Sequence, residues 1–243
     1  MAKYQNKYTI EKKNAWKIFD RIYKRYDLLN HFLSLGFDFG WRKKLSSLAI
    51  KKKSAVLLDL ATGTGDVLFS LINHSGGFKR AIGIDMSRNM VNYAVRKRAA
   101  KKLNNKVDFL IGDANSIPLK SGSFDMVTMA FGIRNISEPI KALKDINRVL
   151  AKDGIVLILE FSLPENRILK KLHLFYLRYL IPLIGKIISG DTEAYVYLGK
   201  TIEVFPYGDN FLKLMEKAGF NKCEKYPLTF GIVTVYRGIK CYE

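Results

Sequence analysis

This 243-residue chain contains little cysteine and no recognisable export signal. Cys223 and Cys241 are the only cysteines, and neither lies in a CxxC or Cys/His ligand pattern. Neither a disulfide framework nor a structural metal site is therefore expected. The N-terminus also has no apolar signal segment and no small-residue cleavage site. We expect a reduced, cytoplasmic protein that binds no metal.

Long apolar runs are absent as well. The longest apolar stretch, residues 172–188, is interrupted by Arg178, Pro182 and Lys186. It is shorter than the roughly 20 apolar residues that a membrane-spanning helix needs. No internal repeat or low-complexity linker divides the chain. Its length therefore predicts a single domain over residues 1–243.

Acidic residues are few relative to basic ones. The chain has 22 Asp and Glu against 41 Lys and Arg, which gives a formal net charge of +19. Such an excess indicates a polyanionic neighbour, either nucleic acid or an anionic lipid surface. A general enrichment in lysine is the alternative, because most of the excess is scattered along the chain. Composition leaves both interpretations open.

The chain does contain a regular alternation of strand and helix patterns, which predicts a doubly wound α/β fold with a parallel sheet. Two closing strands are expected to form an antiparallel edge, and an amphipathic helical insertion is expected at 163–188. The predicted strands are 55–60, 80–85, 107–111, 125–130, 155–161, 222–227 and 231–240. The other predicted helices are 9–33, 41–50, 66–73, 87–102, 138–150 and 207–218.

A glycine-rich turn, DLATGTGD at 59–66, follows the first strand. Glycine lets the backbone approach a ligand closely, and the helix that follows offers free N–H groups. A dinucleotide-binding turn would have a third glycine where Leu68 stands. The turn instead resembles the first motif of the seven-strand, Rossmann-like class I methyltransferases, with Ala61 at its first glycine; a purely structural turn is the alternative. The resemblance implies that it holds S-adenosyl-L-methionine, with the candidate residues Asp59, Gly63, Thr64 and Gly65.

Acidic residues also follow the second and third strands. Asp85 stands where a carboxylate meets a ribose diol in doubly wound folds, although it could simply cap the next helix. Asp113 and Ala114 can supply an acceptor and a backbone N–H to adenine, although Asp113 also suits a turn. Candidate ligand-binding residues thus follow three successive strands, whose carboxyl ends meet at one edge of a parallel sheet. This arrangement favours a shared cofactor site over three unrelated turns.

Further motifs carry a closer resemblance. They are Tyr26-Asp27-Leu28-Leu29-Asn30 with Ser34 and Trp41, Phe131-Gly132-Ile133-Arg134-Asn135, Leu159-Glu160-Phe161-Ser162, Asp191 with Tyr195 and Tyr197-Leu198, and Leu228-Thr229-Phe230-Gly231-Ile232. They cover residues 15–240 and resemble the menaquinone/ubiquinone biosynthesis C-methyltransferase family. Asp38 departs from the family signature, which commonly has His there, and this weakens any assignment of a histidine base at that position. Ala130 replaces a Ser of some members, and Lys152-Asp153-Gly154 replaces a Pro-Gly-Gly turn.

The resemblance implies S-adenosylmethionine-dependent methylation of a ring carbon of a polyprenyl quinol, either demethylmenaquinol or a ubiquinol precursor. Arg134 is the candidate for binding the developing oxyanion, because a guanidinium is always charged and offers several donors. Asn135 is expected to orient the other oxygen, and Tyr26 to belong to a lid over the ring. The alternatives are a surface ion pair for Arg134 and a core aromatic for Tyr26. The general base stays open among Asp27, His31, Asp38 and Glu160, and His31 is more typical of a capping or surface residue.

Two segments are expected to build the substrate side, an N-terminal helical cap (1–50) and a helical insertion (163–205). Within the insertion, residues 169–188 suit a polyprenyl tail or reversible contact with an anionic membrane surface, although a core-covering helix pair is the alternative. The basic residues beside this apolar stretch are Lys170, Lys171, Arg178 and Lys186.

An RNA methyltransferase is the competing enzyme, motivated by the charge of +19. The chain lacks an Asn-Pro-Pro-Tyr type motif and a cysteine pair after the fourth strand, so nucleic acid is not the expected partner. A binding module without turnover is a third interpretation, against which the intact cofactor motifs argue. The oligomeric state is not predicted.

Overall fold

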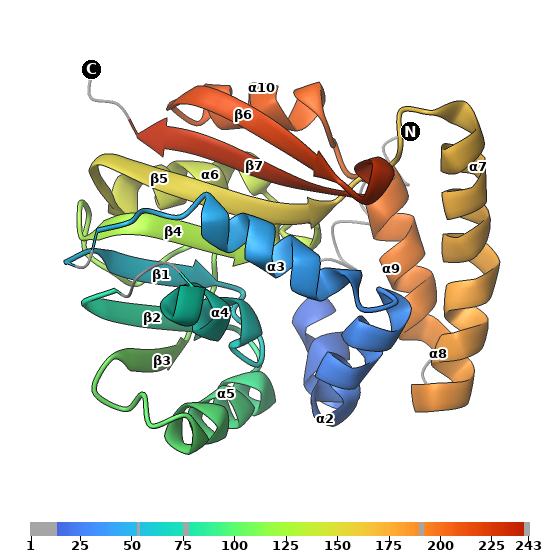
Figure 1. The fold of residues 1–243 in the computed structure, drawn as a ribbon, viewed down its shortest axis with the longest axis horizontal. Helices are drawn as coiled ribbons and strands as arrows, with labels where there is room; N and C mark the ends of the chain where they lie inside the picture. The colour runs from blue at the N-terminus through green and yellow to red at the C-terminus, as the bar shows by residue number, and fades with distance from the viewer. Residues whose placement is uncertain (1–13, 53, 75–77, 190–191, 241–243) are drawn as a thin grey trace.

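A computed structural model describes residues 14–52, 54–74, 78–189 and 192–240, and a seven-stranded sheet runs through its centre (Figure 1). The strand order is β3-β2-β1-β4-β5-β7-β6. The strands are β1 (Val56–Leu60), β2 (Arg80–Asp85), β3 (Val107–Ile111), β4 (Phe124–Ala130), β5 (Leu150–Phe161), β6 (Phe220–Leu228) and β7 (Val233–Lys240).

Strands β1 to β5 pair in parallel, whereas β7 is antiparallel to both β5 and β6. The sheet is parallel at its centre because its strands are apolar on both faces: Leu57, Leu58 and Leu60 of β1 are all fully buried. The predicted doubly wound, mostly parallel fold with an antiparallel edge is confirmed.

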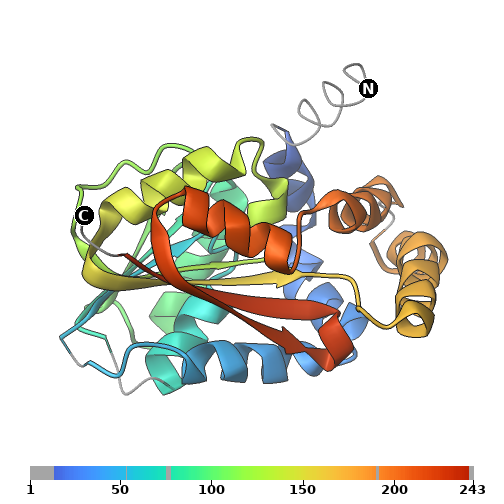
Figure 2. The same ribbon diagram turned by 90° about the horizontal axis from the view of Figure 1, so that it is seen from above.

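Helices cover both faces of the sheet, as the view from above shows (Figure 2). α4 (Asp66–His74) packs on one face, and α6 (Pro139–Val149) and α10 (Asp209–Lys217) pack on the other. α5 (Arg88–Ala100) lies beside β2 and β3. Two separate apolar cores result, one on each side of the strands.

The N-terminal segment forms α2 (Ala15–Leu33) and α3 (Phe37–Ser47). The prediction for α3 was wrong by four residues, because Gly36 turns the chain with a φ of +78° and starts the helix earlier. Trp41 and Leu45 of α3 pack into the sheet core. The predicted helix start at Thr9 lies outside the described residues.

The insertion is divided into several helices, all within the predicted range 163–205. It comprises α7 (Arg167–Phe175), the π-helical segment η2 (Tyr176–Leu180), α8 (Ile181–Ser189) and a separate α9 (Thr192–Val204). Asn166 caps α7 by accepting from the backbone N–H groups of Ile168 and Leu169. Asp191 lies outside the described residues. The division of the chain into cap, sheet and insertion stays a prediction.

The turn predicted at residues 152–154 lies inside β5. This strand starts at Leu150, five residues earlier than predicted, directly after α6. Asp153 adopts a φ of +57°, and the register between β4 and β5 shifts along this stretch. An irregularity within a strand therefore replaces the expected loop.

Candidate active site

The cofactor predictions meet at one edge of the sheet. Parallel strands bring their carboxyl ends to the same edge, where a cleft of about 480 Å³ opens beyond β1, β2 and β3. We call it the cofactor cleft, and its volume is within the usual range for small-molecule sites. The predicted site residues that line it are Tyr26, Gly63, Asp85, Asp113, Ala114 and Asn135.

Buried side chains hold the glycine-rich turn in place. The buried carboxylate of Asp59 accepts hydrogen bonds of 2.6 Å from both Thr62 Oγ1 and Thr128 Oγ1. Burial raises the pKa of Asp59 to about 6. Gly65 has a φ of +84°, and a Cβ there would lie 2.8 Å from the ring of Phe69. Neither Asp59 nor Gly65 lines the cofactor cleft, so their part in cofactor binding stays a prediction.

Asp85 connects the turn to the next helix. Its Oδ2 accepts from the Gly63 N–H and its Oδ1 from the Ser87 N–H, both at 2.8 Å. The residue that caps α5 is Ser87, whose hydroxyl accepts from the Met90 N–H, so the cap interpretation of Asp85 is wrong. Burial raises the pKa of Asp85. Each carboxylate oxygen retains lone-pair capacity for a ligand hydroxyl.

Asp113 begins a tight turn after β3. Its Oδ1 accepts from the backbone N–H and the side-chain amide of Asn115, at 2.8 and 2.9 Å. The turn interpretation is therefore confirmed, but it does not remove Asp113 from the site, because Asp113 and Ala114 both line the cofactor cleft. Apolar Met86 and Met90 line the same cleft and suit a flat adenine ring.

A second cavity of about 340 Å³ lies next to the cofactor cleft. Its walls come from α2, α3, α7, η2, α8, α9 and the 3-10 turns η1 (Ile133–Asn135) and η3 (Thr229–Gly231). Most lining side chains are aliphatic or aromatic, and we call it the apolar cavity. Phe19, Tyr26 and Phe131 line both spaces and so form the wall between them.

Arg134 is buried at the apolar cavity, with 4% of its surface exposed. Its Nη1 donates to Glu160 Oε1 at 2.7 Å and to the Phe131 carbonyl at 2.6 Å. The guanidinium carbon lies 5.2 Å from the centre of the Phe161 ring. The alternative of a surface ion pair is wrong, because Glu160 has no exposed surface.

Tyr26 forms part of this wall, and Asn135 lies on its cofactor-cleft side. Burial raises the pKa of Tyr26, whose ring packs edge-on against Phe19. Tyr26 is therefore more than a core aromatic, because it lines both cavities. Asn135 lines the cofactor cleft, and its Oδ1 accepts from Tyr197 Oη at 3.2 Å. Their chemical roles stay predictions.

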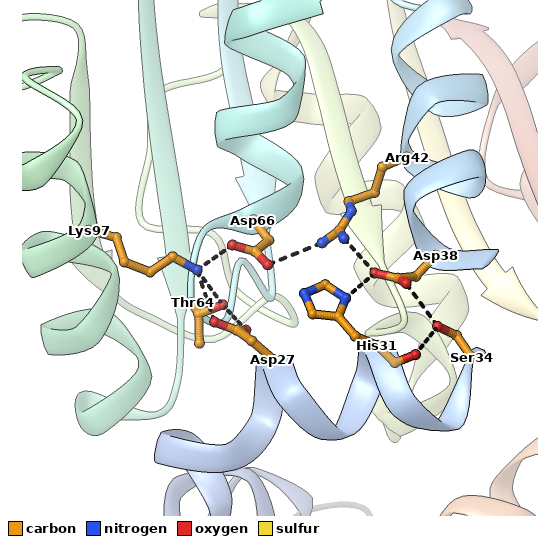
Figure 3. A network of polar contacts seen from close by, with 8 residues as sticks. All are labelled: Asp27, His31, Ser34, Asp38, Arg42, Thr64, Asp66 and Lys97. Atoms are coloured by element: carbon orange, nitrogen blue, oxygen red, sulfur yellow. Dashed lines mark hydrogen bonds and ion pairs between the residues drawn. The ribbon is translucent and has the colours of Figure 1, made fainter. Parts of the chain in front are cut away.

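A polar network joins α2 and α3 to the glycine-rich turn (Figure 3). Lys97 of α5 contacts Asp27, Thr64 and Asp66 together. Thr64 Oγ1 also donates to Asp27 Oδ1 at 2.6 Å, so this predicted cofactor residue is engaged with α2 instead of lining the cleft. Sequence reasoning missed Lys97, although basic residues at the end of its helix were visible.

The network continues along α3. Arg42 bridges Asp66 and Asp38, and Asp38 Oδ2 lies 2.6 Å from His31 Nδ1. Asp38 Oδ1 accepts from Ser34 Oγ at 2.8 Å. His31 is thus neither a helix cap nor a free surface residue. It is paired with the carboxylate that stands where the family signature commonly has histidine.

Two features are absent from the part of the chain that the structure describes. No three His, Cys, Asp or Glu residues there gather as a metal site. No helix among the same residues is both long and apolar enough to cross a membrane.

The lining of the cofactor cleft fits S-adenosylmethionine. The carboxylate of Asp85 suits a ribose diol, Asp113 suits an amino group, and Gly63 leaves open backbone beside them. A seven-stranded sheet of this order with such a cleft defines a class I S-adenosylmethionine-dependent methyltransferase.

Two solved structures share the fold. A methyltransferase from Thermotoga maritima, described as a possible histamine N-methyltransferase, has a TM-score of 0.62 at 23% identity and covers 93% of this chain and 99% of its own. A putative S-adenosylmethionine-dependent methyltransferase from Methanococcus maripaludis has a TM-score of 0.66 at 16% identity, covering 92% and 94%.

The sequence narrows this class to one family. Residues 7–240 match the ubiE/COQ5 methyltransferase family, and the chain belongs to it. Demethylmenaquinone methyltransferase of Bacteroides fragilis is 37% identical over 92% of this chain and 91% of its own length. The ubiquinone/menaquinone biosynthesis C-methyltransferase of Syntrophotalea carbinolica is 40% identical, with 92% of each chain covered. This chain is therefore an S-adenosylmethionine-dependent methyltransferase.

Proposed function

We propose that this protein methylates a ring carbon of a polyprenyl quinol in menaquinone or ubiquinone biosynthesis, with the ring held in the apolar cavity. C-methylation in that biosynthesis is the function of its family. The observation that supports the placement is the shared wall of Phe19, Tyr26 and Phe131. Because the cofactor cleft and a space suited to an apolar substrate share these three side chains, two reactants can be placed next to each other there.

The chain's own residues support this chemistry. When bound, S-adenosylmethionine supplies an electrophilic methyl group. Arg134 lies at the cavity with Nη1 committed to Glu160 and Phe131, and its Nε has no hydrogen-bond partner among the described residues. Nε is buried, but Nη2 makes neither of these contacts, so the guanidinium fork keeps N–H donors for a substrate oxygen that becomes negative. The apolar walls exclude water from the reaction.

Transfer of a labelled methyl group tests the proposal. Tritium from S-adenosylmethionine should enter a quinol extract and not RNA. Label in RNA alone would contradict the proposal and support the competing enzyme. Mass spectrometry of the quinones that accumulate in a deletion strain then identifies the natural acceptor as a menaquinone or a ubiquinone precursor.

We also propose reversible docking on an anionic membrane, since a polyprenyl tail resides in the bilayer. Large apolar side chains are exposed at helical spacing along α7, η2 and α8, which form the right-hand edge of Figure 1. They are Ile168, Leu172, Phe175, Tyr179 and Leu183. The corner between α2 and α3, which the sequence did not indicate, exposes Phe32, Leu35 and Phe37 as well.

The basic residues near this surface are not equally available. Lys171 is exposed, and a lysine near an anionic leaflet contributes on the order of 1 kcal/mol. Arg178 instead forms a two-point ion pair with Glu203, at 2.8 and 2.6 Å. The side chain of Lys186 lies outside the described part of the structure.

Vesicle sedimentation tests the docking. The protein should bind phosphatidylglycerol vesicles at low ionic strength, be released by salt, and ignore phosphatidylcholine vesicles. Serine at Ile168, Phe175 and Tyr179, none of which lines the apolar cavity, should weaken binding, whereas Ile140→Ser on α6 should not. A triple variant that binds normally would contradict docking through this surface. A wild-type dimer that the triple variant loses would assign the surface to a second copy.

A further inference from the structure

Methylation of a ring carbon produces a proton that must leave the site, and this inference rests on the proposed function. A C–CH3 bond forms while the S–CH3 bond breaks with its electron pair left on sulfur. The ring carbon loses its hydrogen as H⁺, and both products are neutral at the reacting centre. The positive charge of the sulfonium therefore departs as that proton. Among the described residues, the one imidazole that lines the apolar cavity is His173, and burial lowers its pKa to about 4, so it is a poor carrier for this proton.

A small polar space lies beside the wall between the two cavities. It has a volume of about 70 Å³, enough for a few water molecules. Its lining includes Asp27, His31, Asp38, Arg42 and Asp66, and we call it the polar chamber. Tyr26 and Phe131 line the chamber and both larger cavities, so the chamber adjoins the wall at which the two reactants meet.

Asp38 belongs to both the apolar cavity and the polar chamber. It lines each of them and is only 6% exposed. Arg42, His31 and Ser34 hold its carboxylate from three directions. A carboxylate fixed in this way can receive a proton from one side and transfer it to the other.

His31 continues the path outward. Its Nδ1 lies 2.6 Å from Asp38 Oδ2, and 31% of its side chain is exposed. The imidazole stacks on Phe39 at a ring-centre distance of 4.7 Å, which holds its orientation. Histidine gains and loses protons near neutral pH more readily than other side chains.

We propose that Asp38 and His31 form the relay that carries the released proton from the apolar cavity to solvent. The proton passes to the Asp38 carboxylate, directly or through water in the polar chamber, and then through the His31 imidazole to bulk water. Arg42 and Asp66 face the pair from α3 and α4, Asp27 lines the chamber from α2, and Lys97 of α5 contacts Asp27 and Asp66 (Figure 3). Three carboxylates, Asp27, Asp38 and Asp66, face two cations here, and Asp59 also lines the chamber, so a transient proton meets no excess of positive charge.

The other candidate carboxylates are less suitable. Glu160 is fully buried against Arg134 and lines none of the three spaces. Asp27 lines the polar chamber but not the apolar cavity, and its two oxygens accept from Thr64 and Lys97. Among the four open candidates, only Asp38 reaches the apolar cavity and only His31 joins it to solvent.

His31→Gln is the sharpest test. A glutamine amide can still donate to Asp38, but it cannot carry a proton. We expect turnover with quinol to fall at least about tenfold, in the range that proton-transfer groups contribute. The melting temperature and the calorimetric Kd for S-adenosylmethionine should stay unchanged. Asp108→Asn, which removes ion pairs with Arg80 and Arg98 away from all three spaces, is the control and should leave turnover at the wild-type level.

Chemical rescue separates a relay from a structural contact. His31→Ala should regain turnover when imidazole is added, but not with pyrazole, which has the same size and is a much weaker base. Asp38→Asn should be slow and unresponsive to imidazole, because the first carrier is missing.

Two outcomes would overturn the relay. One is a His31→Gln enzyme with wild-type turnover, and the other is equal rescue of His31→Ala by imidazole and pyrazole. A wild-type enzyme that methylates no quinol would instead contradict the proposed function. If His31→Gln fails to fold, the rescue of His31→Ala and the turnover of Asp38→Asn still decide the question.

Discussion

The cofactor cleft and the apolar cavity are built in opposite ways. The cleft takes Gly63, Asp85 and Asp113 from three successive strand ends, where each turn follows its own strand. The apolar cavity draws on residues from Ile18 to Ile232, in helices that neighbour each other only after the chain folds. A cofactor shared by many enzymes can be held by short local motifs, whereas a substrate particular to one family is enclosed by distant segments.

The two regions also differ in which groups hold their charged side chains. Asp85 in the cleft is held by backbone N–H groups of its own and the preceding turn. The apolar cavity is lined instead by the buried His173 and by Arg134, which pairs with the fully buried Glu160 behind the cavity wall. Substitutions at the cavity should therefore affect folding more strongly, while substitutions at the cleft should affect ligand affinity.

Arg134→Met should have the largest effect. It leaves Glu160 buried without its cation, and loss of one partner from such a pair costs about 3–5 kcal/mol of unfolding free energy. Urea denaturation measures this. The double variant Arg134→Met with Glu160→Met should recover most of the loss. A single variant as stable as the wild type would show that the cavity does not depend on the pair.

Arg134→Lys addresses function at the same position. It retains the charge, but an ammonium does not reproduce the planar fork. We expect unchanged affinity for S-adenosylmethionine and lower turnover at saturating quinol. Wild-type turnover would assign Arg134 a purely structural role.

His173 should make stability acid-sensitive. Burial lowers its pKa from 6.5 to about 4, so the unfolded chain takes up a proton at a higher pH than the folded protein. The stabilising contribution is complete above pH 6.5 and is lost as the pH falls through 4, by up to about 3 kcal/mol. His173→Phe should remove this loss in denaturation curves across that range.

Asp59 titrates over part of the same interval with the opposite sign. Its pKa is raised from 3.8 to about 6, so its contribution to stability is complete below pH 3.8 and is lost as the pH rises through 6. The wild-type curve contains both effects, and the difference between wild type and His173→Phe isolates the histidine. Parallel curves for the two proteins would contradict the prediction.

Asp85→Ala should act on the cleft alone. We predict that the carboxylate accepts two hydrogen bonds from the ribose diol, so its loss should raise the Kd for S-adenosylmethionine at least about tenfold, or about 1.4 kcal/mol. Calorimetry on the folded variant measures this. Unchanged binding would remove Asp85 from the cofactor site.

Tyr197→Phe should have the smallest effect. It tests whether the cofactor cleft and the apolar cavity depend on each other. Tyr197 lines the apolar cavity, and its hydroxyl donates to Asn135 of the cofactor cleft at 3.2 Å. Loss of one such bond costs about 1 kcal/mol. A much larger loss of cofactor affinity would show that the two regions are coupled through this contact.

Most of the sheet was predictable, because short apolar runs bounded by glycine, aspartate and charged residues mark buried parallel strands. Strands β2 and β3 match the prediction residue for residue. Errors arose where one residue changed the geometry locally. Gly36 starts α3 early, and the stretch at 152–154 stays in β5 because pairing with β4 continues past it.

The site residues also divide into those set by local sequence and those set by tertiary contacts. The sequence predicted the positions of Gly63, Asp85 and Asp113 at the cleft because each follows its own strand, whereas Thr64 and Gly65 do not line the cleft. Lys97 and the pairing of His31 with Asp38 were not found, and Arg134 proved to be buried. A side chain's burial and partners depend on segments that approach only after folding, and the residue type alone does not report them.

The sequence by itself determined the sheet, the cofactor turn and the family, because periodicity and short motifs are local properties of the chain. Only the tertiary structure decided which residues share a space. It brought Tyr26 and Phe131, about one hundred positions apart, into one wall, and it placed Asp38 between an apolar and a polar compartment. The physical reason is that packing and desolvation act through distance in space, which the order of residues does not fix.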